Sequence, residues 1–265
     1  MPHNASPNQK TRPGFPARLA PLVPPTKVTV ANRMSKPTQT RHQPPQGVGM
    51  DSSAVRQSMV TKLAQQGLSD AQVLLAMGAV ERHRFVDSAL VNQAYEDTSL
   101  PIGLGQTISK PGVVARMLQL LRQGSSGRLG RVLEIGTGCG YQAAVLSHLC
   151  TEVYSMERLR GLHDKARDNL RHLRLANVHL LFGDGMAGYP KGAPYAGIIS
   201  AAGGEAVPQA WLDQLAVGAR LVAPVAGGAA GSGAQSLVVI EKTPLGLRQT
   251  VMEAVRFVPL KSGVA

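Results

Sequence analysis

From Arg131 onward, short apolar segments alternate with amphipathic or charged segments, and this alternation constrains the fold more than any other feature. The apolar segments have the length of buried strands, whereas the segments between them repeat with helical spacing. The expected strands are 131–135, 152–156, 178–182, 195–200, 220–225, 237–241 and 250–257, and the expected helices are 141–149, 159–173 and 208–215. Strands that alternate with helices form a mostly parallel sheet covered on both faces. We therefore expect an α/β fold of the doubly wound type.

The segment before this alternation predicts a cap of helices. Helical periodicity runs from Val55 to a closing Gly67, Ser69 begins a capping-box pattern S-D-A-Q, and apolar residues at 113–121 indicate another helix. A short helical stretch is expected at 84–91, a structured Gly/Pro-rich loop at 99–111 and a linker at 124–130. We therefore expect a single domain over residues 51–265. Its helical cap and substrate loop occupy 51–123, and its cofactor-binding sheet occupies 124–265.

Residues 1–50 differ in composition from the rest of the chain. They hold ten of the 18 prolines, seven lysines and arginines and no acidic residue, so only +5 of the net charge of +12 belongs to the remainder. Such a segment buries too little apolar surface to fold, and we predict a disordered basic extension. The prolines disfavour a transit peptide, and translation from Met50 is an alternative. The charge first suggests an anionic partner, but most of it lies outside the predicted domain.

The first strand of the alternation ends in a glycine-rich loop. Gly136, Gly138 and Gly140 follow the apolar strand directly and precede a helix, which is where a doubly wound fold binds its ligand. A dinucleotide fingerprint would need its third glycine at position 141, which is tyrosine. Glu134 at the strand end would repel a diphosphate and attract an ammonium group. These features favour a nucleoside that bears an amino acid, S-adenosylmethionine, over a loop without a ligand.

Two further acids follow the next two strands. Glu157 ends the second strand, about 20 residues after the glycines, where a carboxylate can accept hydrogen bonds from both ribose hydroxyls. Asp184 lies in a Gly-Asp-Gly turn after the third strand, at the edge where the adenine would lie. Either acid alone would more often be a solvated loop residue. Because both occur at successive strand ends, we interpret them as parts of the cofactor site.

Four motifs over residues 55–263 resemble the protein-L-isoaspartate O-methyltransferase family. They are LPIGLGQTIS at 100–109, VLEIGTGCGY at 132–141, GDG at 183–185 and VRFVPL at 255–260. The glycine loop alone would indicate only a class I methyltransferase, and the first and last motifs select this family. The resemblance implies a seven-stranded sheet and methyl transfer from S-adenosylmethionine to the free α-carboxylate of L-isoaspartyl residues in damaged proteins and peptides.

The resemblance also assigns residues. Ser109 matches the active-site serine, Glu157 the ribose acid, and Asp184 and Gly185 the adenine turn; the methionine-side loop is matched by Glu134, Gly136, Thr137, Gly138 and Gly140. A carboxylate is ionised at neutral pH and needs no general base, so Ser109 is expected to position the substrate and not to act as a nucleophile. The chain departs from the family pattern at Ala201–Gly204 and at Lys261, and we assign no role there.

Other function classes fit less well. A nucleic-acid methyltransferase is suggested by the basic charge, but the sequence has no D-P-P-Y-type loop and neither cysteine follows a proline. A binding module with a decayed site conflicts with the intact Ser109, Glu134, Glu157 and Asp184, and a nicotinamide oxidoreductase conflicts with the glycine spacing. The histidines show no metal-binding spacing, and Leu221–Ile240 contains a proline and several glycines, so no metal and no membrane helix are expected. We expect a cytoplasmic monomer that binds no nucleic acid.

Overall fold

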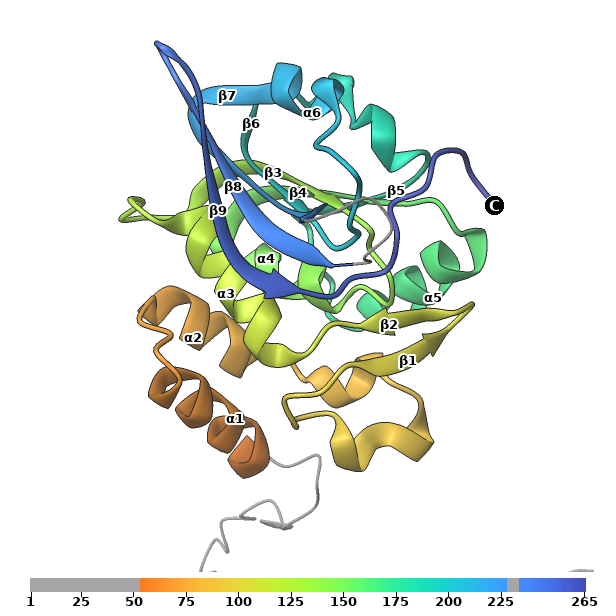
Figure 1. Ribbon diagram of the computed structural model, residues 1–265. Coiled ribbons are helices and arrows are strands. Elements are labelled where there is room, and N and C mark those ends of the chain that lie inside the picture. Colours follow the sequence, from red (N-terminus) through yellow and green to blue (C-terminus); the bar gives the residue numbers. More distant parts are fainter. Residues whose placement is uncertain (1–52, 228–233) are drawn as a thin grey trace, which may run out of the picture. The chain divides into compact units, whose positions relative to one another are not determined.

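A seven-stranded sheet in the order β5-β4-β3-β6-β7-β8-β9 lies at the centre of the fold in the computed structural model (Figure 1). The strands are β3 Leu129–Ile135, β4 Cys150–Glu157, β5 Val178–Phe182, β6 Tyr195–Ser200, β7 Leu215–Ala226, β8 Gln235–Thr243 and β9 Gly246–Val255. Strands β3 to β7 pair in parallel, and β8 is antiparallel to both neighbours. The chain moves outward from β3 to β5 and then returns to β6 beside β3. The predicted doubly wound, mostly parallel sheet is confirmed, and its strand order reverses between β3 and β6.

Alternate side chains of the central strands form two hydrophobic cores. Val132 and Val153 pack with helices on one face, and Leu133 and Ile198 pack with Trp211 of α6 on the other. The helices of the sheet region are α3 Pro111–Arg122, α4 Tyr141–Leu149, α5 Arg160–Arg171 and α6 Gln209–Gln214. With α3, α4 and α5 on one side and α6 on the other (Figure 1), the sheet is covered on both faces. The central strand β6 is therefore buried along almost its whole length, whereas the outer strand β9 is mostly exposed.

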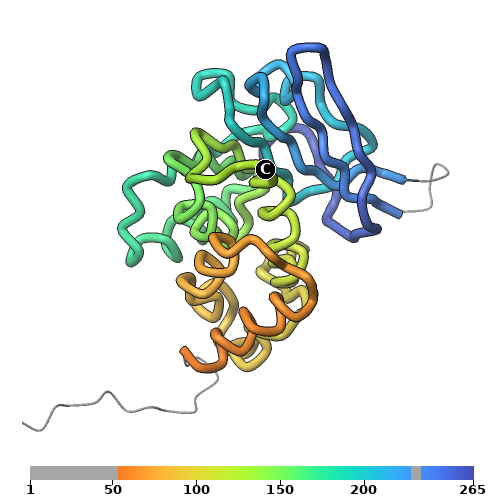
Figure 2. Tube along the Cα trace, turned by 90° about the vertical axis from the view of Figure 1, so that its left-hand side faces the viewer, coloured from red at the N-terminus to blue at the C-terminus, as the bar shows by residue number. Residues whose placement is uncertain are grey.

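The N-terminal helices α1 Ser53–Gln65 and α2 Ala71–Ala79 pack on α3 and α4. They lie at the opposite end from the strands β7 to β9 (Figure 2). The expected capping box at Ser69 is wrong by one residue. Asp70 is the N-cap and accepts hydrogen bonds from the backbone N–H groups of Gln72 and Val73, while the backbone N–H of Ser69 donates to Gln119 Oε1. The carboxylate is also held by Arg122 at 3.0 Å, a tertiary contact that fixes which residue begins the helix.

Two segments have a different secondary structure from the one that the sequence predicted. The helical stretch expected at 84–91 is two 3₁₀ turns, η1 Arg82–Phe85 and η2 Ser88–Gln93. The loop expected at 99–111 contains an antiparallel hairpin, β1 Leu100–Gly103 and β2 Gln106–Ile108, with positive φ at Gly103, Leu104 and Gly105. The sequence did not predict this hairpin. Its segment is rich in glycine and proline, and its two strands are too short to show an alternating hydrophobic pattern.

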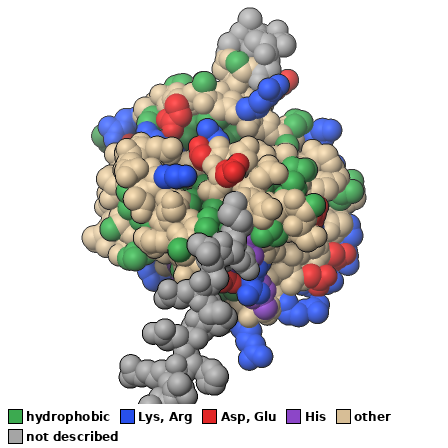
Figure 3. Space-filling view, turned by 90° about the horizontal axis from the view of Figure 1, so that it is seen from below, with side chains coloured by type: hydrophobic (Ala, Val, Ile, Leu, Met, Phe, Trp, Pro, Cys, Tyr) green, Lys and Arg blue, Asp and Glu red, His purple; other side chains and the backbone are tan. Residues whose placement is uncertain are grey.

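The structure describes residues 53–227 and 234–265. The predicted disordered extension 1–50 and residues 228–233 of the β7–β8 connection lie outside them. None of the described helices has the length and apolar character that a bilayer span requires. Basic and acidic side chains of the described residues are scattered over the visible part of the face shown in Figure 3.

Candidate active site

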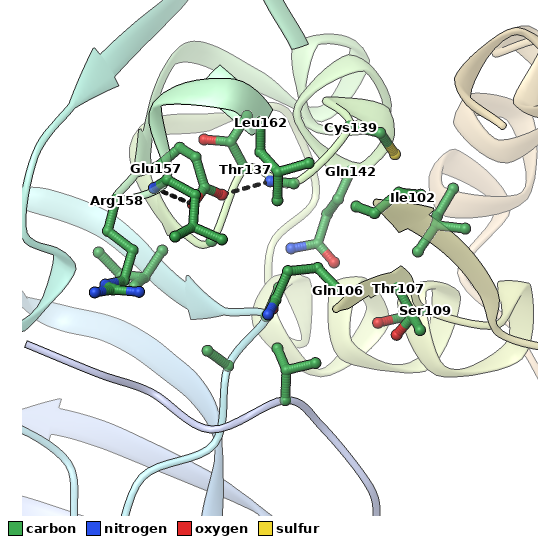
Figure 4. A pocket seen from close by; sticks show the side chains of 18 of the residues that line it. Ile102, Gln106, Thr107, Ser109, Thr137, Cys139, Gln142, Glu157, Arg158 and Leu162 are labelled. Carbon is green, nitrogen blue, oxygen red and sulfur yellow. Dashed lines mark hydrogen bonds between the residues drawn. The ribbon is translucent and has the colours of Figure 1, made fainter. Parts of the chain in front are cut away.

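A cavity of about 260 Å³ lies at the carboxyl ends of β3, β4 and β6, where the strand order reverses. The β1–β2 hairpin, the glycine loop, the ends of β4 and β6 and the segment after β9 supply its wall. The polar or charged side chains on that wall belong to Gln106, Thr107, Ser109, Thr137, Gln142, Glu157, Arg158 and Lys261. Figure 4 shows Glu157 and Ser109 on opposite sides of this pocket, with Gln106 and Gln142 between them. The pocket is at the position where open α/β sheets bind ligands.

The backbone conformation of the glycine loop, with close contacts at two of its glycines, disfavours side chains there. Gly136, Gly138 and Gly140 have φ values of 87°, 58° and 91°, which only glycine adopts readily. A Cβ on Gly138 would lie 3.2 Å from the Ile102 side chain of the hairpin. Gly136 and Gly138 line the pocket, whereas Gly140 packs behind it against Leu170 of α5. Two of the glycines therefore expose backbone to a ligand, and the third allows α5 to pack closely.

Glu157 ends β4 with its side chain on the pocket wall. Its carboxylate accepts hydrogen bonds from the backbone N–H groups of Gly138, at 2.8 Å, and Leu159, at 2.9 Å. Each oxygen keeps a second lone pair available. The side chain is thus fixed by the glycine loop and retains the capacity to accept two ligand hydroxyls.

Glu134 lies beneath the glycine loop and not on the pocket wall. Its register partner on β4 is Ser155, whose hydroxyl donates to Glu134 Oε2, and Ser155 Oγ also lies 2.6 Å from Thr137 Oγ1. Burial raises the pKa of Glu134 to about 8, while the Ser155 hydroxyl and the Gln142 amide act in the opposite sense. Glu134 is therefore mostly protonated at pH 7 in this structure.

This carboxyl group predicts a pH dependence of stability. The unfolded chain loses the proton near pH 4.5 and the folded chain near 8, so stability from Glu134 is fully present below pH 4.5 and is lost as pH rises through 8. The free energy of unfolding of the wild type should fall relative to Glu134→Gln by up to roughly 1.4 kcal/mol per pH unit in this window. Urea unfolding at pH 5, 6, 7 and 8 measures the difference. Parallel pH profiles would contradict the assignment.

Asp184 holds the C-terminal segment of the chain instead of facing the pocket. Its carboxylate accepts hydrogen bonds from the N–H groups of Met186, at 2.9 Å, and Gly263, at 2.7 Å. The same segment bonds to Arg158 through Gly263 O and Ala265 N. Asp184 therefore shapes the pocket edge through the backbone of the segment after β9, and the neighbouring Gly185 lines the pocket itself.

Gly185 has no room for a side chain. A Cβ there would lie 2.6 Å from Ile135 Cγ2, whereas a Cβ on Gly183 would meet nothing closer than Met156 Sδ at 3.6 Å. Gly185→Ala should lower the free energy of unfolding by about 1–3 kcal/mol, because Ile135 is buried and must move. Gly183→Ala is the matched control and should change it by less than about 0.5 kcal/mol. Denaturant unfolding distinguishes them, and equal effects would contradict the steric argument.

Ser109 follows β2 at the opposite side of the pocket. Its carbonyl oxygen accepts a hydrogen bond from the buried guanidinium of Arg82 at 2.8 Å. Its hydroxyl has no hydrogen-bond partner among the described residues and borders the pocket. The backbone of Ser109 is thus fixed while its hydroxyl remains free to bind a ligand.

The segment 201–204, which departs from the family pattern, is fixed by backbone hydrogen bonds to the segment after β9. Ala201 and Ala202 line the pocket, and Gly203 forms backbone hydrogen bonds with Val258 and Leu260 of the segment after β9. A Cβ on Gly203 would lie 2.4 Å from Gln235 Nε2, so this glycine leaves space for the Gln235 side chain. Lys261, the other departure, is on the pocket wall.

Sequence reasoning missed several pocket residues. Gln142 is in the first turn of α4, immediately after the glycine loop, and this position was the available signal for it. Gln106 and Thr107 belong to the motif at 100–109, but no function was predicted for them. The hairpin that places their side chains at the pocket was not expected from the sequence. Among the described residues, no group of three His, Cys, Asp or Glu side chains is arranged to hold a metal ion.

Sequence comparisons with known proteins all identify the same family. A family model described as protein-L-isoaspartate(D-aspartate) O-methyltransferase matches residues 54–265. A curated protein-L-isoaspartate O-methyltransferase from Methylibium petroleiphilum is 54% identical over 97% of this chain and 99% of its own. Another of that name, from Leptothrix cholodnii, is 60% identical over 83% of this chain and 77% of its own.

Solved structures give the same result for the fold. A structure named protein-L-isoaspartate O-methyltransferase superposes with a TM-score of 0.70 and 28% identity, covering 79% of this chain and 67% of its own. A Plasmodium falciparum structure in complex with S-adenosyl-L-homocysteine superposes with a TM-score of 0.65 over 78% of this chain and 98% of its own. Its identity of 23% supports the likeness of fold alone.

Proposed function

Because the chain belongs to the protein-L-isoaspartate(D-aspartate) O-methyltransferase family, we propose that the pocket beneath the β1–β2 hairpin is the site of that reaction. The protein transfers a methyl group from S-adenosylmethionine to the free α-carboxylate of L-isoaspartyl residues in damaged proteins and peptides. The single observation that supports this site most is the free Ser109 hydroxyl, which faces the carboxylate of Glu157 across a pocket floored by the glycine loop.

The residues at the pocket fit S-adenosylmethionine. Glu134 Oε1 and Gln142 Nε2 are buried polar atoms without a hydrogen-bond partner of good geometry among the described residues. Gln142 is on the pocket wall and can donate to the carboxylate group of an amino acid, whereas Glu134 lies beneath the glycine loop and would support it from below. Glu157 would hold the ribose hydroxyls, Gly136 and Gly138 would leave space for the ligand, and Gly185 would border the adenine. Thr137 would contact the ligand from the pocket wall, and Gly140 and Asp184 would support this wall from behind.

The chemistry requires positioning more than proton transfer. S-adenosylmethionine supplies a methyl group on a positively charged sulfur, and its transfer to a carboxylate oxygen gives a neutral ester and a neutral thioether. Ser109 would donate a hydrogen bond to the substrate carboxylate and hold one oxygen in line with the methyl group at about 3 Å. The hairpin glycines Gly103 and Gly105 would allow the backbone of the substrate to approach.

A peptide pair tests the activity. The full-length protein is incubated with methyl-labelled S-adenosylmethionine and two peptides that differ only in an L-isoaspartyl or L-aspartyl linkage. Base-labile label on the isoaspartyl peptide alone is the expected result. Label on both peptides, on neither, or on added nucleic acid would refute the proposal.

We also propose that the protein works as a monomer in the cytoplasm. Cys139 and Cys150 are both buried and free, which suits a reducing compartment. Light scattering after gel filtration measures the oligomeric state, and cell fractionation measures the location. A stable dimer or a membrane-bound fraction would contradict these expectations.

A further inference from the structure

Arg82 is a fully buried cation directly behind the pocket wall. Its side chain has 0% exposure, and it contacts two residues that line the pocket. Nη2 donates to Ser109 O at 2.8 Å, and the guanidinium carbon lies 4.7 Å from the centre of the Tyr141 ring. Nε donates to Ala94 O at 2.8 Å, which fixes the plane of the group.

This guanidinium has no carboxylate partner in the residues that the structure describes. No Asp or Glu there lies within ion-pair distance of it, and its Nη1 is buried without a hydrogen-bond partner. Asp97, the carboxylate that acts on it from farther away, pairs with Lys110 and accepts from the Gly112 N–H. Burial lowers the pKa of Arg82, but an arginine side chain still remains charged at neutral pH. A buried cation without a nearby anion is unfavourable, so an anionic ligand next to this position would be stabilised.

We propose that Arg82 is a positioning residue for the anionic substrate: it fixes Ser109 through its carbonyl, and its uncompensated charge favours a carboxylate at the Ser109 hydroxyl. The proposal rests on the proposed function, because the substrate α-carboxylate supplies the missing anion. The methyl ester product is neutral at this position. The positive charge of Arg82 therefore attracts the substrate carboxylate more strongly than it attracts the product.

The expected effect falls on substrate binding. A cation stabilises the bound carboxylate at least as much as the transition state, in which that charge is being lost, so removing it should raise KM without lowering kcat. A residue with only a structural role would instead weaken all ligands together or lower the amount of folded protein.

Arg82→Gln tests the charge while keeping hydrogen-bonding groups. The KM for an isoaspartyl peptide should rise roughly tenfold or more. The kcat should stay within threefold, and the KM for S-adenosylmethionine within twofold. The neutral probe is the same peptide with an isoaspartyl α-carboxamide, whose inhibition constant should change by less than twofold. Arg82→Lys keeps the charge, and the ratio of carboxylate to carboxamide affinity should stay within threefold of the wild type.

Three outcomes would overturn the role of Arg82. They are an unchanged peptide KM in Arg82→Gln, an equal loss of carboxamide binding, and a collapse of the affinity ratio in a folded Arg82→Lys protein. Circular dichroism and S-adenosylhomocysteine binding establish folding, and if the glutamine variant does not fold, the lysine variant decides. Wild-type methylation separates the two proposals. Its absence refutes the activity, whereas normal methylation with an unchanged ratio in Arg82→Gln refutes only this inference.

Discussion

Glu157→Ala is expected to raise the KM for S-adenosylmethionine roughly a hundredfold, because two effects of the carboxylate are lost together. It leaves the N–H groups of Gly138 and Leu159 without their acceptor, which loosens the glycine loop where the ligand would lie. It also removes the acceptor for the ribose hydroxyls. Initial rates with varied S-adenosylmethionine and calorimetric binding of S-adenosylhomocysteine measure the change.

A matched control lies on the same strand. Glu152 near the start of β4 is partly exposed and pairs with Arg131 at 3.7 Å, so Glu152→Ala should leave both KM values within twofold. In Glu157→Ala the KM for the isoaspartyl peptide should also change little. A larger loss for the peptide than for the cofactor would place Glu157 on the substrate side of the pocket.

Strand and helix patterns predicted the sheet well because its central strands β3 and β6 are buried on both faces. The segments 178–182 and 195–200 and the helix 141–149 have the predicted bounds. Strand β7 begins five residues before the expected Arg220, directly after α6. No sequence signal separates that helix from the strand, because the pairing of Tyr195 with Leu215 and a bulge define the start.

The candidate site was predictable where a residue ends a strand. Glu157 reaches the pocket because it is the last residue of β4, and a side chain there projects past the sheet edge. Glu134 comes one residue before the end of β3 and is level with Ser155, two residues before Glu157, so it lies within the sheet and is fully buried. Which acid faces a ligand therefore depends on strand register, and one sequence does not determine that register.

Contacts between distant segments were not predictable. Gly263 N donates to Asp184 from 79 residues away, and Arg82 reaches Ser109 across 27 residues. Neither pair follows a local periodicity or a capping rule. The chemistry of the site residues was thus accessible from the sequence, but the groups that hold them in place required the three-dimensional arrangement.

Ser109→Ala is expected to lower kcat on an isoaspartyl peptide by about two orders of magnitude, while the KM for S-adenosylmethionine stays within twofold. The hydroxyl has no partner among the described residues, so its removal leaves no protein group unsatisfied, and the fold should be unaffected. The loss should therefore appear in turnover, because the substrate carboxylate loses the donor that aligns one oxygen. Single-turnover methylation with saturating S-adenosylmethionine measures this step directly.

Two further variants make this result specific to the hydroxyl. Ser109→Thr keeps the donor and should recover much of the rate, and Ser125→Ala, at an exposed serine in the turn before β3, should leave the rate unchanged. If Ser109→Ala weakened S-adenosylhomocysteine binding as much as it lowered turnover, the serine would belong to the cofactor side. If threonine failed to recover the rate while the protein remained folded, the size of the side chain would matter more than its hydrogen bond. The expected pattern places the donor on one wall and the Glu157 carboxylate, proposed to bind the cofactor, on the other, as methyl transfer between two ligands requires.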